Sequence, residues 1–110
     1  MTIYIAGPMS GLPEHNYPAF YAAEKKLVNL GHHVINPARL DDESGETART
    51  WDWYLRRDLQ AMLGSADVVV LLPGWESSRG AMLERYVALT LGMIVLTLQE
   101  VLGQPKGEKR

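Results

Sequence analysis

Four short runs of apolar and strand-forming residues predict four strands along the chain. Residues 2–6 are rich in strand-forming side chains and stop at Gly7, which is typical of a strand that ends in a turn. Residues 66–72 (ADVVVLL) form one continuous apolar run that ends before Pro73, as expected for a central strand covered on both faces. Shorter apolar runs at residues 33–36 and 93–98 predict the other two strands.

Three helices are predicted between these strands, because apolar side chains recur there every three or four positions. A polar residue that can cap a helix precedes or begins each range, and a glycine follows each one as a stop signal. The polar stretch at residues 41–49 predicts a loop, and Trp51 is expected in the core. The predicted helices, with their cap residues, are 16–30 (Asn16), 51–63 (Thr50) and 80–91 (Ser78).

The resulting order βαβαβαβ predicts an α/β fold, a small doubly wound parallel sheet of the Rossmann or flavodoxin-like kind. We expect four or five strands in the order 2-1-3-4, flanked by helices, in a single domain at residues 1–102 with a flexible tail at residues 103–110. In such sheets a ligand binds at the carboxyl ends of the strands where the order reverses. The loops at residues 7–16 and 73–80 are therefore expected to build the site.

Length, charge and composition restrict the possible functions. A length of 110 residues suits a single domain. The net charge of −2 argues against a nucleic acid polymer as partner. It contains no Cys, so thiol catalysis and Cys-ligated metals are excluded. The sequence shows no apolar run near 20 residues and no signal peptide, so we expect a cytoplasmic protein without a membrane segment. His15, His32 and His33 lack metal-ligand spacing, and we expect neither a metal nor a cofactor.

Two carboxylates fall on apolar helix faces. Asp58 interrupts the stripe of the second predicted helix, and Glu84 lies between Ala81 and Ala88 of the third. A carboxylate on such a face costs free energy unless it is paired, hydrogen-bonded or used in chemistry. The alternative is that each one lies partly exposed at the edge of its stripe.

Other candidate residues each have a functional and a structural interpretation. Small residues after the first strand let backbone N–H groups approach a ligand, and residues 77–80 open a helix whose positive end favours an anion. Ser78 is otherwise only a cap, Trp75 either stacks on a flat ligand or packs, and Tyr4 is either a core residue or reaches the site. Asp67, at the start of the third strand, is expected to cap a turn or to tether a neighbouring loop.

Several segments together resemble a known family. They are YIAGPMSG at residues 4–11, NP at 36–37, RDL at 57–59, and residues 66–72 and 74–84, where an Asp-headed apolar strand precedes the pattern Ser-x-Gly-x-x-x-Glu. The span from residue 3 to residue 96 resembles the nucleoside 2-deoxyribosyltransferase superfamily. Within that superfamily it is most similar to a short, phage- and bacteria-associated branch, the DUF4406 group.

The resemblance implies roles for individual residues. Glu84 would match the family's nucleophile, and Asp58 the residue that holds the nucleoside and assists departure of the base. Tyr4 would match an active-site Tyr of the related nucleotide N-glycosidases. Ser78 stands where transferases of unphosphorylated nucleosides carry Asp and 5′-monophosphate hydrolases carry Ser, which favours a phosphorylated substrate. From Asp58 to Asp67 the spacing is one residue longer than in better-known members.

The expected activity is therefore cleavage of the N-glycosidic bond of a nucleoside 5′-monophosphate, by hydrolysis or base transfer, through a glycosyl-enzyme intermediate on Glu84. Trp75 would stack on the base. The alternative is a nucleotide-binding or sensing domain that keeps the pocket without turnover. The residues expected to hold the 5′-phosphate are Gly7, Ser10, Ser78 and Gly80. Pro8, Met9 and Gly11, in the same loop as Gly7, are also expected to bind the substrate.

The third predicted helix is apolar almost all round, from Ala81 to Leu91. One face of a small sheet cannot cover all of that surface. We therefore expect a homodimer or higher oligomer that buries the outer side of this helix.

Overall fold

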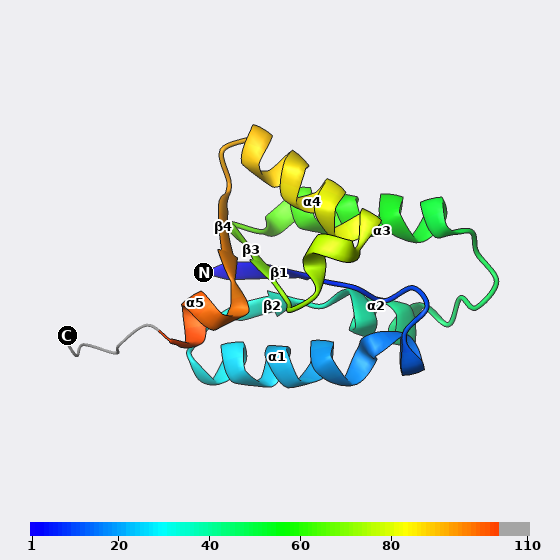
Figure 1. Ribbon diagram of the computed structural model, residues 1–110, viewed down its shortest axis with the longest axis horizontal. Coiled ribbons are helices and arrows are strands. Elements are labelled where there is room, and N and C mark those ends of the chain that lie inside the picture. The colour runs from blue at the N-terminus through cyan, green and yellow to red at the C-terminus, as the bar shows by residue number, and fades with distance from the viewer. Residues whose placement is uncertain (104–110) are drawn as a thin grey trace.

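The computed structural model describes residues 1–103 and confirms the predicted fold class. Four parallel strands form one sheet in the order β2-β1-β3-β4 (Figure 1). The predicted tail at residues 103–110 lies, apart from Gly103, outside the described residues. The strands are β1 (Thr2–Ala6), β2 (His33–Ile35), β3 (Val68–Leu71) and β4 (Ile94–Thr97).

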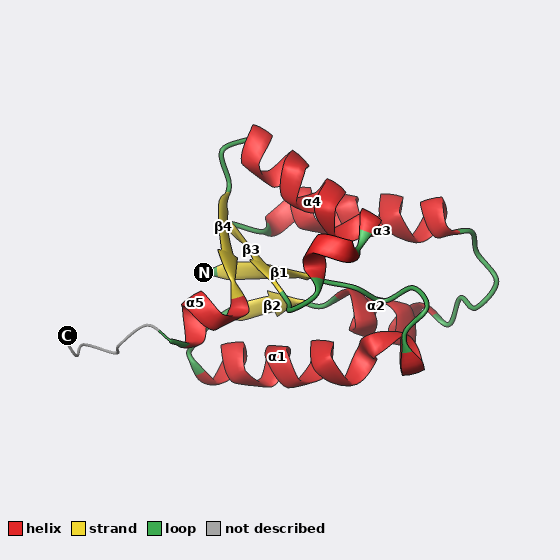
Figure 2. Cartoon of the chain, in the orientation of Figure 1, coloured by secondary structure: helices red, strands yellow, loops and turns green. Residues whose placement is uncertain are grey.

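Helices cover both faces of the sheet (Figure 2). α1 (Tyr17–Asn29) and α5 (Leu98–Leu102) lie on one face, and α3 (Trp51–Ser65) and α4 (Arg79–Thr90) on the other. α2 (Pro37–Ser44) follows β2 at the carboxyl edge of the sheet. Two short 3₁₀ helices, Pro13–Asn16 and Trp75–Ser77, precede α1 and α4.

Side-chain alternation along β1 divides the core into two clusters. Ile3 and Ile5 pack with Phe20 and the rest of the buried face of α1. Tyr4 and Ala6 point to the opposite face and pack with buried residues of α3 and α4. This register directs the only Tyr of β1 toward the two helices that carry the candidate carboxylates.

Two of the predicted caps are confirmed and one is wrong. Thr50 Oγ1 accepts a hydrogen bond from Trp53 N, and Ser78 Oγ accepts one from Ala81 N at 3.1 Å. Asn16 stands at the N-cap position of α1, but its side chain makes no capping hydrogen bond: it lies in the left-handed region at φ 60°, and its Nδ2 donates to Pro8 O at 2.9 Å. The side chain of Asn16 therefore holds the loop after β1 instead of the start of α1.

The structural role predicted for Asp67 is confirmed, but its partner is the start of β1 and not a turn or loop. Asp67 Oδ2 accepts a hydrogen bond from Thr2 N at 3.0 Å, and Asp67 N donates to Thr2 O. These two contacts join the beginnings of β1 and β3, so Asp67 fixes the pairing of the two central strands and lies at the sheet end opposite to the candidate site.

The structure differs from the sequence-based expectation at three places. The predicted loop at residues 41–49 is helical up to Ser44, because α2 starts at Pro37 with Asn36 as its cap. α5 was not predicted; Thr97 and Glu100 form a reciprocal capping box at its start. Trp51 is not in the core but 43% exposed, since the first turn of α3 projects beyond the carboxyl ends of the strands.

Candidate active site

A cavity of about 810 Å³ opens at the carboxyl ends of β1 and β3, where the strand order reverses. Both predicted loops contribute to it: Gly7 to Ser10 and His15 on one side, and Ser77 to Gly80 on the other. The first half of α3, residues of α2, the segment that joins these two helices and the start of α1 also line it. The position of the cavity is thus the one expected for a ligand site in a doubly wound sheet.

Tyr4 and Glu84 meet in the cavity wall. Tyr4 is fully buried, and its hydroxyl donates to Glu84 Oε2 at 2.6 Å. Glu84 is 5% exposed because it shares the inner face of α4 with Ala81 and Ala88. The side chain of Tyr4 is therefore both a core residue and a site residue.

Asp58 is the second buried carboxylate of the cavity, at 9% exposure. It lies one turn before Met62 on the buried face of α3. Arg57 Nε and Nη2 both donate to Asp58 Oδ1, at 3.1 and 2.6 Å. The interpretation that Asp58 and Glu84 are exposed edge residues is therefore wrong; both are buried, and both are hydrogen-bonded.

Each carboxylate uses one oxygen for these contacts and leaves the other free. In residues 1–103, Glu84 Oε1 and Asp58 Oδ2 accept no hydrogen bond. Neither is among the described side-chain atoms that are both buried and unpaired, which are His32 Nδ1 and Arg57 Nη1. Since both residues line the cavity, each offers one accessible oxygen to a bound molecule.

Burial changes the protonation of this pair. Loss of solvent raises the pKa of Glu84 to about 8, although the hydrogen bond from Tyr4 favours the charged form. Loss of solvent also raises the pKa of Asp58 to about 6, against the opposing effect of Arg57. The pKa of Tyr4 is raised well above its usual value by burial and by the two carboxylates. Between about pH 6 and 8 the pair of carboxyl groups therefore holds one proton, which lies mainly on Glu84.

The loop after β1 approaches β3 closely. A Cβ on Gly7 would lie 2.9 Å from Leu72 Cβ, so only glycine fits there without a shift. Gly7, Pro8, Met9 and Ser10 line the cavity as predicted. Gly11 does not line it; at φ 79° it forms the turn that follows.

Ser78 and Gly80 line the opposite side of the cavity, at the first turn of α4. Because Ser78 Oγ caps the helix, the structural interpretation of this residue is confirmed, and its place on the cavity wall leaves a binding role open. The first backbone N–H groups of a helix favour an anion, so this side of the cavity suits a negatively charged part of a ligand.

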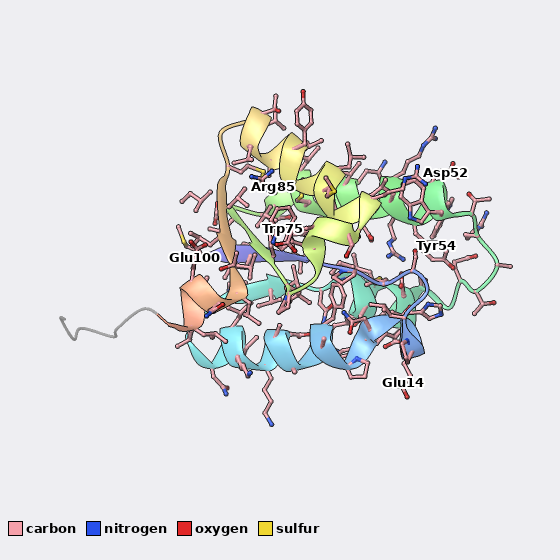
Figure 3. All side chains as sticks on the ribbon, viewed as in Figure 1. Glu14, Asp52, Tyr54, Trp75, Arg85 and Glu100 are labelled. Atoms are coloured by element: carbon pink, nitrogen blue, oxygen red, sulfur yellow. The ribbon has the colours of Figure 1, made fainter. Side chains whose placement is uncertain are left out.

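Trp75 does not line the cavity. It packs against the core between the sheet and α4, and the guanidinium of Arg85 lies 5.0 Å from the centre of its ring (Figure 3). The prediction that Trp75 stacks on a base is therefore not supported by its position. Trp51 lines the cavity instead, with Arg79 stacked on its ring at 4.5 Å.

A polar network next to Asp58 was not predicted. Arg57 Nη2 donates to Asp41 Oδ1 at 2.5 Å, and Tyr17 OH donates to Asp41 Oδ2 at 2.6 Å. These contacts join α1, α2 and α3 around one side of the cavity. The sequence signal for this network is the Arg57-Asp58 dipeptide, but the sequence predicts a loop at Asp41 and gives no sign of its contact with Arg57.

In residues 1–103, no three or more His, Asp or Glu side chains gather in a way that would hold a metal ion. No described helix is long and apolar enough to cross a membrane.

The fold and the cavity define the class: a doubly wound α/β domain with a buried carboxylate pair at the carboxyl ends of its strands. Residues 1–97 match the family described as Domain of unknown function (DUF4406), and the chain belongs to this family. The match confirms the resemblance to the DUF4406 group. The relation to the nucleoside 2-deoxyribosyltransferase superfamily stays a prediction. No curated protein matches the chain.

Proposed function

We propose that this protein cleaves the N-glycosidic bond of a nucleoside 5′-monophosphate. The observation that carries the proposal is the pair of buried carboxylates, Glu84 and Asp58, each with one bound and one free oxygen on the wall of the same cavity. Most enzymes that break a glycosidic bond use a pair of carboxyl groups as catalytic residues. The cavity volume of about 810 Å³ suits a nucleotide-sized molecule.

In the proposed reaction Glu84 Oε1 attacks C1′ of the sugar, and the bond from C1′ to the base nitrogen breaks. The electron pair of that bond leaves with the base, which takes a proton from Asp58 Oδ2. Water or a second base then attacks C1′, releases Glu84 and returns a proton to Asp58. Tyr4 donates to the other oxygen of Glu84 and orients it for attack.

This mechanism needs Glu84 ionised and Asp58 protonated. Because the pKa of Glu84 is about 8 and that of Asp58 about 6, this form is the less populated arrangement of the single shared proton. The proposal therefore gives kcat/KM a bell-shaped pH profile, with a maximum at about pH 7. Activity falls below about pH 6, where both groups are protonated, and above about pH 8, where both are ionised.

Phosphate binding is assigned to the two loops that face each other across the cavity. The hydroxyl of Ser10 and the backbone N–H groups near Gly7 and Gly80 supply donors without a net positive charge. Ser78 Oγ already accepts from Ala81 N, and its own proton remains to be donated. A free nucleotide as substrate implies a cytoplasmic location.

The decisive experiment measures base release from a panel of nucleoside 5′-monophosphates by chromatography, with the matching nucleosides alongside. Glu84→Gln keeps the shape and the hydrogen bond from Tyr4 but removes the nucleophile. We expect it to lower base release on the order of a thousandfold or more. Glu76→Gln, an exposed carboxylate outside the cavity, is the matched control and should keep full activity. Equal activity of Glu84→Gln and the wild type would refute the assignment.

A nucleotide-binding or sensing domain is the second candidate. The raised pKa of Glu84 favours it, because a protonated carboxyl binds ligands but does not attack C1′ at neutral pH. Calorimetry with intact nucleotides separates the two candidates. Tight binding of a nucleotide that stays intact after long incubation would support sensing and refute turnover.

We also propose that the domain works as a homodimer or higher oligomer. The outer side of α4 and the adjacent β4 expose a group of large apolar side chains, which a second copy would bury. The residues of this apolar face are Met82, Tyr86, Leu89, Leu91 and Ile94.

A further inference from the structure

Arg57 occupies a central position beside the carboxylate pair without lining the cavity itself. Its Nη2 lies 2.5 Å from Asp41 Oδ1 and 2.6 Å from Asp58 Oδ1, so one nitrogen bridges two carboxylates from two helices. The rings of Trp53 and Tyr54 lie 5.7 and 5.4 Å from the guanidinium carbon. The guanidinium is therefore fixed both by charge and by aromatic contacts.

This arrangement is costly for the fold. The side chain of Arg57 is 19% exposed, and its Nη1 is buried without a hydrogen-bond partner in the described residues. A partly buried ion pair with an unpaired donor adds little stability to a fold compared with apolar packing. Stability alone therefore does not account for this arginine.

The geometry at Asp58 shows what Arg57 achieves. Both of its hydrogen bonds to Asp58 go to Oδ1, which leaves Oδ2 free at the cavity. Asp41 accepts hydrogen bonds from both Arg57 and Tyr17. Because these contacts hold the guanidinium of Arg57 in place, it cannot move with Asp58 if the side chain of Asp58 rotates. The orientation of Asp58 is thus determined by three helices together.

We infer that Arg57 is a positioning residue of the carboxylate pair, which bridges Asp41 and Asp58 so that Asp58 Oδ2 stays directed at the leaving base. The catalytic part of this inference rests on the proposed function. The orientation and charge state of Asp58 do not, and they can be measured without a substrate.

The charged and titratable groups near Asp58 come from every element around it. They are Arg57 on α3 itself, Asp41 on α2, Glu84 on α4 and Tyr4 on β1. Arg57 lowers the pKa of Asp58, whereas Asp41 raises it. Neutralising Arg57 and neutralising Asp41 should therefore shift the titration of Asp58 in opposite directions.

The first test follows the carboxyl carbon of Asp58 by NMR during a pH titration of the full chain. Arg57→Gln should move the midpoint up by about one pH unit, and Asp41→Asn should move it down. Arg57→Lys keeps the charge and should leave the midpoint close to that of the wild type. Arg56→Gln, an exposed neighbour, is the matched control and should not move it. Because any charge this close to Asp58 shifts its midpoint, these shifts test the contact of Arg57 with Asp58. The comparison of kcat with KM in the second test examines its role in positioning.

The second test measures kcat and KM for a cleaved nucleoside monophosphate across pH. Arg57→Gln should lower kcat about tenfold or more with little change in KM, and should move the acidic limb of the profile to higher pH. Arg57→Lys should recover part of kcat, and Asp41→Asn should move the same limb to lower pH. If Arg57→Gln does not fold, Arg57→Lys and Asp41→Asn still decide the question.

The two proposals fail in different ways. Opposite NMR shifts in a chain that releases no base would support the role of Arg57 at Asp58 and refute the proposed function. Absent or parallel shifts in a chain that releases base would overturn the role of Arg57 and leave the proposed function standing. Opposite shifts together with a lower kcat for Arg57→Gln support both.

Discussion

Glu84 shows the conflict between burial and charge at the scale of one residue. In the unfolded chain its carboxyl titrates near 4.5, whereas burial raises the pKa in the folded protein to about 8. The folded state then binds the proton more tightly than the unfolded state between these two values. The contribution of Glu84 to stability is therefore fully present below about pH 4.5 and is lost as the pH rises toward about 8.

This direction of the pH dependence gives a prediction for Glu84→Gln, a substitution that keeps the shape of the side chain but cannot ionise. As the pH rises from about 5 to about 9, the variant should gain stability relative to the wild type, because only the wild type must bury a charge. One pKa unit corresponds to about 1.4 kcal/mol, so the relative gain should reach a few kcal/mol. Urea unfolding at both pH values measures it, and Glu76→Gln is the exposed control. A constant difference between variant and wild type would contradict the raised pKa.

The two carboxylates were predictable because a charged residue on an apolar helix face is visible in the sequence. Arg57 was not, because its partner Asp41 is 16 residues away and on another element. The prediction that Trp51 lies in the core failed for a related reason. The apolar stripe of its helix includes Trp51, and only the projection of α3 beyond the sheet, visible in Figure 1, places it at the cavity.

At the scale of elements, the close contact between the ends of β1 and β3 gives a second prediction. Gly7→Ala puts a methyl group 2.9 Å from Leu72 Cβ, on a strand end that cannot yield easily. We expect a loss of about 1–3 kcal/mol in stability, together with weaker nucleotide binding, because the loop that lines the cavity must move. Thermal unfolding and calorimetry measure the two effects.

Gly64→Ala provides the control for this substitution. Gly64 lies in α3, and a Cβ there would meet nothing within 4 Å. Alanine is the better helix former, so this variant should be neutral or slightly more stable. If Gly7→Ala behaves in the same way, the close approach of β1 and β3 does not require glycine.

Helices with an apolar stripe can be predicted from the sequence, whereas α2 cannot. The sequence predicts a strand at residues 33–36 and a loop at residues 41–49, and no helix between them. Its residues are mostly polar, and only Pro37 and Ala38 are buried. Contacts distant in sequence hold it in place: Asp41 with Tyr17 and Arg57, and Arg39 with Glu24 at 3.1 Å. Such an element depends on its neighbours, so local pattern alone does not reveal it.

At the scale of the whole molecule, the topology followed from the alternation of elements, because right-handed crossovers leave few arrangements for four parallel strands. Assembly is different. α4 directs Glu84 inward to the cavity while its outer side exposes the apolar face of Met82, Tyr86, Leu89, Leu91 and Ile94. The sequence shows that such a helix lacks a partner on one side but does not identify the partner.

We expect the wild type to sediment as a dimer or larger species at micromolar concentration, with this apolar face buried. Leu89→Glu places a charge in the middle of it and should shift the protein toward monomer, because an unpaired buried carboxylate is costly at an interface. Val28→Glu, at an equally exposed apolar residue of α1, is the matched control and should leave association unchanged. A monomeric wild type would refute the assembly, and equal effects of both variants would place the interface elsewhere. Because α4 also carries Glu84, base release measured beside sedimentation will show whether the carboxylate pair needs the second copy.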